Sequence, residues 1–271
     1  MGVLYTVALP IGNLDDVSLR ALEVLKKADC IACEDTRNTQ ILLNKYQINT
    51  KLIDCHKFNE KQRSSKISEI LENNGTVALV SDAGTPNICD PGSVLIKELV
   101  KSGHKVIAIP GACALTAFLS AVPRENEFFT FVGFLPKTNS QKKELFEKFS
   151  FINCVFYDSP NRFSDTLNLI SELFGSDRQI AVGRELTKIH EEIISGSVGE
   201  ISEYYEKNTL KGEIVAMVFG QNDENCDEAV IKKDIQILKK QGFSDKDISK
   251  ILSSVKNYPK NQVYQLAVNL K

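Results

Sequence analysis

The sequence contains no apolar run that approaches the about 20 residues needed to cross a bilayer. Its beginning, residues 1–6, has neither the basic region nor the length of a secretory signal. It fits a loose myristoylation pattern, but residues 3–9 are more typical of a buried first strand. These absences predict a soluble protein of the cytoplasm that has no membrane attachment.

A large excess of charge of one sign is also missing. Lysine and arginine number 33, aspartate and glutamate number 35, and the formal net charge is −2. This balance excludes a globally basic nucleic-acid binder, so any contact with RNA has to use local basic patches. The length of 271 residues is enough to bury a sizeable core and favours two domains.

Paired cysteines of the kind that build disulfide frameworks or zinc sites are not found either. The seven cysteines are scattered and odd in number, which argues against a disulfide framework. Cys30 and Cys33 have metal or redox spacing, but no second pair follows and none of the three histidines has ligand spacing with them. Both lie in an apolar run, where cysteine usually behaves as a small hydrophobe, so we predict no metal site.

Phosphate-binding fingerprints are a further absence. The turn after the first predicted strand reads Pro10-Ile11-Gly12-Asn13, which is neither the G-x-G-x-x-G pattern of dinucleotide sites nor a Walker loop. The dinucleotide and nucleoside-triphosphate interpretations therefore lose their main support. Taken alone, the same turn fits an ordinary strand-to-helix connection equally well.

The first half of the chain alternates apolar, strand-like runs with helical periodicity, which is typical of βαβ units and a parallel sheet. Ser18 and Thr36 are suitable N-caps for its helices. A polar, helix-breaking linker at residues 122–126 ends a predicted first domain of residues 1–122. We predict strands at residues 4–9, 30–33, 52–53, 77–80 and 106–109, and helices at residues 19–25, near 41–42, and at 67–71, 94–100 and 115–119.

The second half has more predicted strands than helices, which indicates a mixed sheet. We place this second domain at residues 123–224. Two clear helices, around residues 142–149 and 163–173, fall between its strands. The strands are predicted at residues 128–132, 154–157, 180–183, 191–194 and 214–219.

A Lys-rich helical appendage is predicted for residues 225–271. Residues 230–271 contain nine lysines against three aspartates, a local excess of six positive charges. Apolar residues recur at helical spacing on both sides of a turn at residues 241–245, and Ser244 is its predicted cap.

The most informative segment is Ser81-Asp82-Ala83-Gly84-Thr85-Pro86, which follows an apolar strand and is itself followed by Asp90-Pro91-Gly92. A second turn of small residues, Pro110-Gly111-Ala112, follows the next strand. Small residues and prolines at strand ends build a rigid, backbone-lined crevice, and open α/β sheets bind ligands there. Two such loops after neighbouring strands predict one ligand pocket.

Charged residues gather at three further strand ends. Glu34-Asp35-Thr36-Arg37 follows the second strand, and its carboxylates alone are better explained by a helix start. Arg37, however, places an arginine at the strand-end face where ligands bind. Residues 157–162 and 183–192 are dense in polar groups directly after apolar strands. Such runs are either solvated loops or groups that bind phosphate and accept a proton.

Taken together, these motifs resemble the ribosomal RNA small subunit methyltransferase I family, within the tetrapyrrole-methylase-like (class III) S-adenosylmethionine methyltransferases. They occur in the family's order from residue 4 to about residue 220, and the Lys-rich tail resembles the family's small C-terminal helical domain. The matching motifs are Pro10-Ile11-Gly12-Asn13-Leu14, Glu34-Asp35-Thr36-Arg37, Asn59-Glu60, Ser81-Asp82-Ala83-Gly84-Thr85-Pro86, Asp90-Pro91-Gly92, Pro110-Gly111, Gly133-Phe134-Leu135-Pro136, Ser159-Pro160, Arg184-Glu185-Leu186-Thr187-Lys188 and Lys211-Gly212-Glu213.

The resemblance implies two α/β domains with S-adenosyl-L-methionine held in the cleft between them, usually in a homodimer. It implies methyl transfer to the 2′-hydroxyl of a cytidine in the decoding region of 16S rRNA, either as naked RNA or within the small ribosomal subunit. Carried over to this chain, the donor pocket would consist of Pro10, Asp82, Thr85, Ala112, Cys113, Ala114, Tyr157, Gly183, Glu213 and Ile214.

The chain departs from the family pattern at six positions. Cys113 and Asn161 matter most, because both lie in or beside the implied cleft. The departing residues are Phe58 and Asn161 where the family tends to have His, Asn87 in place of Gly, Cys89 and Cys113 in place of Ser, and Ala112 in place of Pro.

The implied chemistry needs an acceptor for the proton of the ribose hydroxyl, which is a poor nucleophile while it keeps that proton. Our hypothesis is that Glu185 or Lys188 assists this proton, with Arg37 and Arg184 positioning phosphates. Further candidates for phosphate contact, which a solvated surface would explain equally well, are Lys137, Lys142, Lys143 and the lysines of the tail.

Two other functions stay open. A tetrapyrrole C-methyltransferase would share this architecture, but the absence of tryptophan and the charged loops argue against a wide, aromatic-lined cleft for a macrocycle. A non-catalytic RNA-binding module for ribosome assembly, with a vestigial donor pocket, is the alternative from another class.

Overall fold

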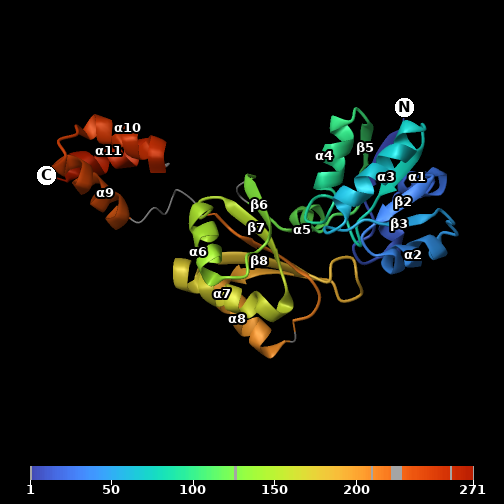
Figure 1. Ribbon diagram of the computed structural model, residues 1–271. Helices are drawn as coiled ribbons and strands as arrows, with labels where there is room; N and C mark the ends of the chain where they lie inside the picture. Colours follow the sequence, from blue (N-terminus) through green and yellow to red (C-terminus); the bar gives the residue numbers. More distant parts are fainter. Residues whose placement is uncertain (1, 125–126, 209, 221–227, 257, 271) are drawn as a thin grey trace.

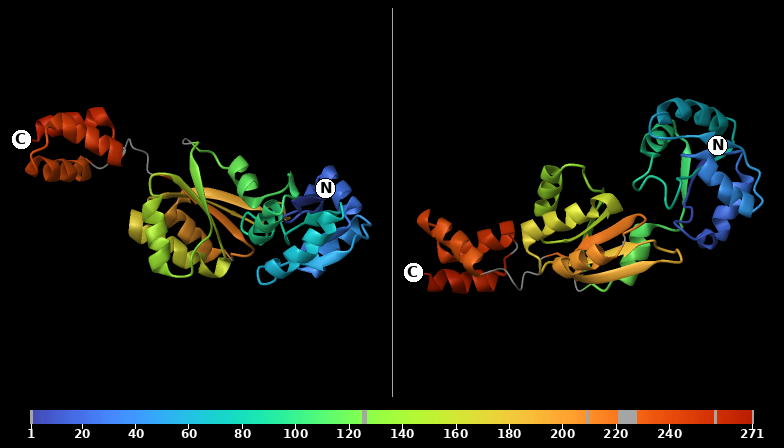
Figure 2. Two further views of the ribbon diagram at one scale, coloured as in Figure 1. Left: turned by 45° about the horizontal axis from the view of Figure 1, so that its top comes forward. Right: turned by 90° about the horizontal axis from the view of Figure 1, so that it is seen from below.

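The computed structural model describes residues 2–124, 127–208, 210–220, 228–256 and 258–270. It contains two five-stranded sheets, each with its own helices, and a group of three helices near the C-terminal end (Figure 1 and Figure 2). This confirms the predicted α/β class with two α/β units and a helical appendage. The last part of the predicted linker, residues 125–126, and the predicted start of the appendage, residue 225, lie outside the described residues.

The first sheet is parallel throughout, with the strand order β3-β2-β4-β1-β5. Because all its strands run the same way, the loops that follow them emerge along one edge of the sheet. Its strands are β1 (Val3–Val7), β2 (Cys30–Cys33), β3 (Leu52–Asp54), β4 (Thr76–Leu79) and β5 (Lys105–Ile109). Its helices are α1 (Leu19–Lys27), α2 (Thr36–Lys45), α3 (Glu60–Glu72) and α4 (Ser93–Lys101), with a single helical turn at Leu14–Asp16.

Helices cover both faces of the first sheet. α1 and α2 pack on one face through Leu25 and Leu43, and α3 and α4 pack on the other through Ile67 and Leu99. Strands that are buried on both faces read as nearly continuous apolar runs. This is why the apolar runs in the sequence located all five strands.

Cys30 and Cys33, the pair with metal or redox spacing, are buried parts of the core. They pack in hydrophobic clusters on opposite faces of the first sheet, because residues three positions apart in a strand point to opposite sides. Burial raises the pKa of each thiol to about 11. Two neutral thiols on opposite faces cannot share a metal ion.

The second sheet is mixed, as predicted, with the order β6-β7-β10-β8-β9. β6 and β7 are parallel, and the remaining pairs are antiparallel. Its strands are β6 (Phe129–Phe134), β7 (Asn153–Asp158), β8 (Gln179–Arg184), β9 (Glu192–Ser197) and β10 (Ile214–Val218). The helices α6 (Asn139–Lys148), α7 (Pro160–Phe174) and α8 (Val198–Lys207) contribute to the hydrophobic cluster on one face.

The helix α5 (Ala114–Ala121) belongs to the first half by sequence but packs on the second sheet. Phe118 and Leu119 share a buried cluster with Val155 of β7 and Val215 of β10. Figure 1 shows α5 between the two sheets. α5 therefore holds the two halves of the molecule together.

Two predicted helix caps have different outcomes. Ser18 is confirmed, because its hydroxyl accepts a hydrogen bond from the Ala21 N–H at 3.1 Å. Thr36 is wrong by one residue: the N-cap of α2 is Asp35, whose carboxylate accepts from the Arg37 N–H at 2.9 Å. A carboxylate satisfies the free N–H groups of a first turn and also suits the helix dipole.

The helix α8 was not among the two helices predicted for the second half. It begins with a capping box in which Ser197 accepts from the Glu200 N–H and the Glu200 side chain accepts from the Ser197 N–H. The pattern Ser-x-x-Glu before an apolar periodicity is the sequence signal that would have located it.

The C-terminal helices α9 (Glu228–Lys240), α10 (Asp245–Lys256) and α11 (Lys260–Asn269) enclose a small core of their own. Ser244 caps α10 as predicted, with its hydroxyl accepting from the Asp247 N–H at 3.2 Å. All views place these helices apart from the second sheet (Figure 1 and Figure 2). Among the described residues, no helix combines the length and apolar character needed to span a membrane.

Glu60, the second residue of the Asn59-Glu60 motif, connects two helices of the first domain. It is buried at the start of α3, and its carboxylate accepts hydrogen bonds from the N–H groups of Gly92, Val94 and Leu95 at 3.0–3.2 Å. Gly92 and the first turn of α4 have no side-chain cap of their own. Glu60 therefore caps α4 from a neighbouring helix and fixes the loop that precedes it.

We expect the substitution Glu60→Ala to lower the free energy of unfolding by about 2–4 kcal/mol, because three N–H groups, two of them in buried hydrogen bonds, lose a carboxylate acceptor. Glu60→Gln keeps an acceptor oxygen and should cost about 1–2 kcal/mol. Urea denaturation measures both values, and amide hydrogen exchange at residues 92–95 locates the effect.

Glu69→Ala is the matched control, because Glu69 is exposed on the same helix and its loss should change stability by less than about 0.5 kcal/mol. Equal stability of the Glu60→Ala and Glu69→Ala variants would contradict the proposed capping role.

Candidate functional site

A cavity of about 590 Å³ lies between the strand-end loops of the first sheet and the loops of the second sheet. This volume falls within the roughly 300–1,000 Å³ of small-molecule sites. Residues 82–85, residues 88–90, Ile11, Cys113 and Ala114 line it from the first half of the sequence. From the second half, the lining consists of Phe134, residues 157–160, Glu185, Leu186, Lys188 and residues 212–215.

The wall formed by the loop after β4 is held by backbone contacts. Leu9 and Gly84 exchange two backbone hydrogen bonds, at 2.8 and 3.0 Å, as an isolated antiparallel bridge. Gly84 has a φ of +74°, which favours glycine. The Thr85 hydroxyl donates to the Ala112 carbonyl at 3.1 Å, so the two loops singled out from the sequence are tied together.

Asp82, Asp90 and Glu213 are three of the five acidic residues that line the cavity; of the other two, Asp158 pairs with Arg162 and Glu185 pairs with Lys188. Asp82 is held at the start of α2, where its oxygens accept from the Asp35 N–H at 3.0 Å and the Asn38 amide at 2.9 Å. Burial raises the pKa of Asp90; Glu213 and Asp82 act in the same direction, and a hydrogen bond with Ser81 opposes them. Converging carboxylates favour a ligand that carries positive charge.

Glu34 directly follows β2 and is not among the residues that line the cavity. Its pKa is raised mainly by burial and then by the negative charges of Asp82 and Asp90, while His56 lowers it. Glu34 is therefore within electrostatic reach of the cavity carboxylates and of the loop after β3.

Aromatic rings form the part of the wall that comes from β6 and β7. Phe134 and Tyr157 pack edge to face with ring centroids 5.4 Å apart. The register between β6 and β7 shifts between Phe131 and Phe134, and Gly133 there has a φ of +69°. This bulge presents Phe134 to the cavity. Burial raises the pKa of Tyr157, whose hydroxyl accepts from the Leu115 N–H at 3.0 Å and stays neutral.

The loop between β8 and β9 contributes an ion pair to the cavity, with Lys188 Nζ 2.8 Å from Glu185 Oε1. Glu185 and Thr187 have φ values of +50° and +66°, which are uncommon for residues with side chains. Two glycines accommodate this loop: a Cβ on Gly12 would lie 2.7 Å from Lys188 Cγ, and a Cβ on Gly212 would collide with the Glu185 carboxylate. Such backbone strain is commonly found at functional sites.

The structure brings most of the predicted site residues together. Glu185 and Lys188, for which we predicted a role in proton transfer, both line the cavity. The predicted donor-pocket residues that line it are Asp82, Thr85, Cys113, Ala114, Tyr157, Glu213 and Ile214.

Three predicted donor-pocket residues, Pro10, Ala112 and Gly183, are not among the residues that line the cavity. Pro10 is buried, and Ala112 contributes the carbonyl that accepts from Thr85. Gly183 lies beneath Phe118 of α5, where an added Cβ would be 2.7 Å from the ring. Its small size serves helix-on-sheet packing in this structure.

The predicted arginines lie outside the lining. Arg184 pairs with Glu192, Nε to Oε2 at 2.8 Å, and the Tyr204 hydroxyl donates to the same carboxylate. Arg37 pairs with Asp35 at 2.6 Å, but its side chain is 88% exposed at the start of α2. Arg37 is thus open to a large ligand, whereas Arg184 is held at the end of β8 by its ion pair with Glu192 of β9.

The prediction that Lys142 contacts phosphate is wrong. The other two lysines predicted for this role in the same segment, Lys137 and Lys143, are exposed. Lys142 is only 2% exposed, and its Nζ donates to the Thr166 hydroxyl at 2.8 Å. That hydroxyl donates to the buried carboxylate of Asp158 at 2.7 Å. Lys142 shares the inner face of α6 with Phe146, one helical turn away, so its ammonium faces the core and cannot reach RNA.

Several lining residues were not predicted as contacts, although most lie in the motifs noted above. They are Ile11, Ala83, Gly84, Ile88, Cys89, Asp90, Phe134, Asp158, Ser159, Pro160, Leu186, Gly212 and Val215. For Ile11, Ala83, Phe134 and Asp158, the signal that could have found them is their position directly after a predicted strand or beside a glycine. No cluster of three metal-ligating side chains is found in the part of the chain that the structure describes.

We expect Asp90→Asn to unfold at a higher temperature than the wild type near neutral pH. The raised pKa means that the charged carboxylate opposes folding above the folded-state pKa. This destabilisation disappears as the pH falls from the folded-state pKa of Asp90 to its unfolded-state pKa. The difference in melting temperature between Asp90→Asn and the wild type should therefore shrink toward acidic pH. Calorimetric melting at several pH values measures it.

Asp165→Asn, on the exposed face of α7, is the control and should show no such pH-dependent gain. If Asp90→Asn melts at or below the melting temperature of the wild type at neutral pH, the charged Asp90 carboxylate does not destabilise the folded protein and the prediction is wrong.

Comparison with known proteins identifies the family. A model of the Tetrapyrrole (Corrin/Porphyrin) Methylases matches residues 3–202. The ribosomal RNA small subunit methyltransferase I of Bacillus subtilis (strain 168) is 39% identical over 274 residues, covering 97% of this chain and 93% of the relative. The protein of that name from Synechocystis sp. is 36% identical over 276 residues, covering 100% and 99%.

Solved structures share the fold at low sequence identity. A diphthine synthase has a TM-score of 0.65 and 14% identity, covering 81% of this chain and 90% of the other. A uroporphyrin-III C-methyltransferase from Thermus thermophilus, complexed with S-adenyl homocysteine, has a TM-score of 0.58 and 15% identity, covering 80% and 97%. From its near full-length similarity to these relatives, this chain belongs to the ribosomal RNA small subunit methyltransferase I family of tetrapyrrole-methylase-like proteins.

Proposed function

We propose that this protein uses S-adenosyl-L-methionine to methylate the ribose 2′-hydroxyl of a cytidine in the decoding region of 16S rRNA. The observation that carries the proposal is a cavity between two α/β units, lined by the motif residues, in a chain related over nearly its whole length to small subunit rRNA methyltransferases. The homodimer and the cytoplasmic location belong to the same proposal and rest on the family resemblance.

The residues of the cavity fit a positively charged nucleoside. The volume of about 590 Å³ suits a ligand of that size, and Asp82, Asp90 and Glu213 complement a sulfonium and an amino group. Residues 83–85 and 113–114 line the cavity with small side chains, so a ligand can approach their backbone closely. S-adenosyl-L-methionine, when bound, would supply a sulfonium methyl group, which in-line attack by the ribose oxygen transfers as the O–CH3 bond forms, the S–CH3 bond breaks and the neutral thioether leaves.

In this proposal, Glu185 and Lys188 act on the proton of the ribose hydroxyl. Oε1 of Glu185 is bonded to Lys188, which leaves its second oxygen to accept the hydroxyl proton. The ammonium of Lys188 then stabilises the negative charge that develops on the ribose oxygen. Arg37, exposed beside Asp82, is placed to bind a phosphate of the RNA strand.

Glu185→Ala and Lys188→Ala should each lower the rate of rRNA methylation by about 10²- to 10⁴-fold, because a positioned general base or its partner is lost. Binding of S-adenosyl-L-methionine, measured by calorimetry, should change little. Gly212→Ala keeps both side chains but adds a methyl group where the Glu185 carboxylate lies, so it should also reduce the rate.

Lys207→Ala is the matched control, because Lys207 is an exposed lysine at the end of α8. Normal methylation by both the Glu185→Ala and Lys188→Ala variants would overturn this assignment.

The C-terminal helices supply a local basic surface for RNA. Ion pairs with acidic neighbours engage three of its lysines, Lys232, Lys239 and Lys256. Exposed lysines for which no ion pair is found among the described residues are Lys233, Lys240, Lys246, Lys250 and Lys260.

Deletion of residues 226–271 should weaken RNA binding and flatten its salt dependence, because each phosphate contact contributes about 0.7–0.9 to the logarithmic salt slope. Titrations at several salt concentrations measure the slope. Lys→Gln changes at residues 240, 246 and 250 remove charge while keeping the helices, and should lower the slope in the same direction. An unchanged slope in both variants would remove the appendage from the RNA-binding surface.

Methyl transfer to under-methylated small ribosomal subunits, mapped at the nucleotide, tests the whole proposal. Absence of S-adenosyl-L-methionine binding would favour a non-catalytic assembly module. Methyl transfer to a tetrapyrrole and none to rRNA would favour the C-methyltransferase alternative.

A further inference from the structure

The loop between β3 and α3, residues 55–59, presents an aromatic side chain to solvent. Phe58 is 93% exposed. A single exposed apolar side chain is common on protein surfaces and carries no function by itself. Phe58 differs from such a residue in three ways: polar contacts hold its loop, the loop lies near the candidate site, and its neighbours are charged.

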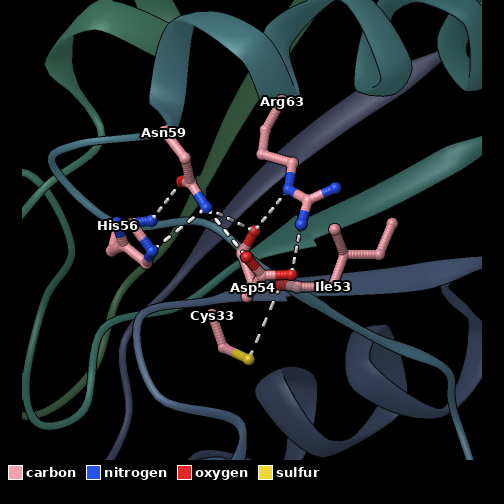
Figure 3. A network of polar contacts seen from close by, with 6 residues as sticks. All are labelled: Cys33, Ile53, Asp54, His56, Asn59 and Arg63. Carbon is pink, nitrogen blue, oxygen red and sulfur yellow. Dashed lines mark hydrogen bonds and ion pairs between the residues drawn. The ribbon is translucent and has the colours of Figure 1, made fainter.

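A network of polar contacts fixes the loop (Figure 3). The Asn59 side-chain oxygen accepts from the His56 N–H at 2.8 Å, and its amide donates to the Asp54 carboxylate at 2.8 Å. Arg63 donates from Nε to the Asp54 carbonyl at 3.0 Å and pairs with the Asp54 carboxylate. The His56 ring packs edge to face against Phe58, with centroids 6.2 Å apart. These contacts hold the turn that carries Phe58 in one conformation.

The loop lies on the same edge of the first sheet as the cavity. β3, β2 and β4 are neighbours in that order, so the loops that follow them succeed one another along the edge. Glu34, after β2, interacts electrostatically with His56 on one side and with Asp82 and Asp90 on the other. Phe58 thus lies two loops along the edge from Asp82 and Asp90, with the loop of Glu34 between them.

Exposed cations surround this part of the edge. Lys57 precedes Phe58, and Lys61 lies on the first turn of α3. The Arg37 side chain, at the start of α2, is 88% exposed. An exposed ring among lysines and arginine matches the way proteins bind single-stranded nucleic acid, with bases stacked on the ring and phosphates on the cations.

We propose that Phe58 is a stacking platform for a nucleobase of the RNA strand that flanks the methylated nucleotide, with Lys57 and Lys61 contacting neighbouring phosphates. This inference rests on the proposed function, because it extends the RNA path from the cavity along the sheet edge. The base that stacks is unpaired, since bases inside a duplex do not expose their faces.

The test uses the full-length protein and a short single-stranded, cytidine-rich RNA oligonucleotide that carries a fluorescent aminopurine. Phe58→Ala should bind this RNA between about fivefold and a hundredfold more weakly and lose the fluorescence quenching caused by stacking. Phe58→Tyr keeps the ring and should behave as the wild type does. The salt slope of Phe58→Ala should equal that of the wild type, whereas a Lys57→Gln, Lys61→Gln double variant should have a lower slope.

Leu19→Ala is the matched control, because Leu19 is 82% exposed at the start of α1 and should leave RNA binding unchanged. Wild-type binding and quenching by Phe58→Ala would overturn the inference. So would a loss that is seen only with assembled subunits, which would indicate contact with a ribosomal protein. If the wild type transfers no methyl group to rRNA, the proposed function fails; if it does and Phe58→Ala binds normally, only this inference fails.

Discussion

The packing of α5 against the second sheet is the interaction on which the candidate site depends. Phe118 is fully buried and lies so close to β8 that only a glycine fits beneath its ring, at Gly183. One turn earlier, the Leu115 N–H is bonded to the Tyr157 hydroxyl of β7. These contacts attach the last helix of the first half to the sheet of the second half. They therefore set the distance between the two walls of the cavity.

The cavity between these walls keeps acidic groups at a cost in stability. Asp90 is partly buried near Asp82 and Glu213, and its raised pKa shows that its charged form is disfavoured there. Hydrogen bonds hold the surrounding loops and offset this cost. Glu60 accepts from three N–H groups at the start of α4, and Leu9 and Gly84 form a backbone bridge. Concentrated carboxylates on braced loops are typical of ligand sites, where stability is given up for binding.

Sequence reasoning located the strands well and individual side chains less well. Buried parallel strands are apolar on both faces, so their runs are visible without any knowledge of the fold. Lys142 shows the limit, because its ammonium is buried beside Thr166 and Asp158, whereas lysines are almost always exposed. Gly183 resembled a ligand contact, but its partner is Phe118, which lies 65 residues earlier in the chain (183 − 118). Such contacts depend on the packing of distant segments.

The sequence by itself determined the α/β class, the order of the strands and the family, because periodicity and ordered motifs are local properties of the chain. It also placed Asp82, Glu185 and Lys188 at strand ends, where ligands bind. Only the tertiary structure decided that Glu185 and Lys188 pair in the cavity that Asp82 also lines, while Arg184 pairs with Glu192. The physical reason is that strand order, the docking of α5 and the rotation of each helix bring residues together across long sequence separations, and no local pattern encodes those distances.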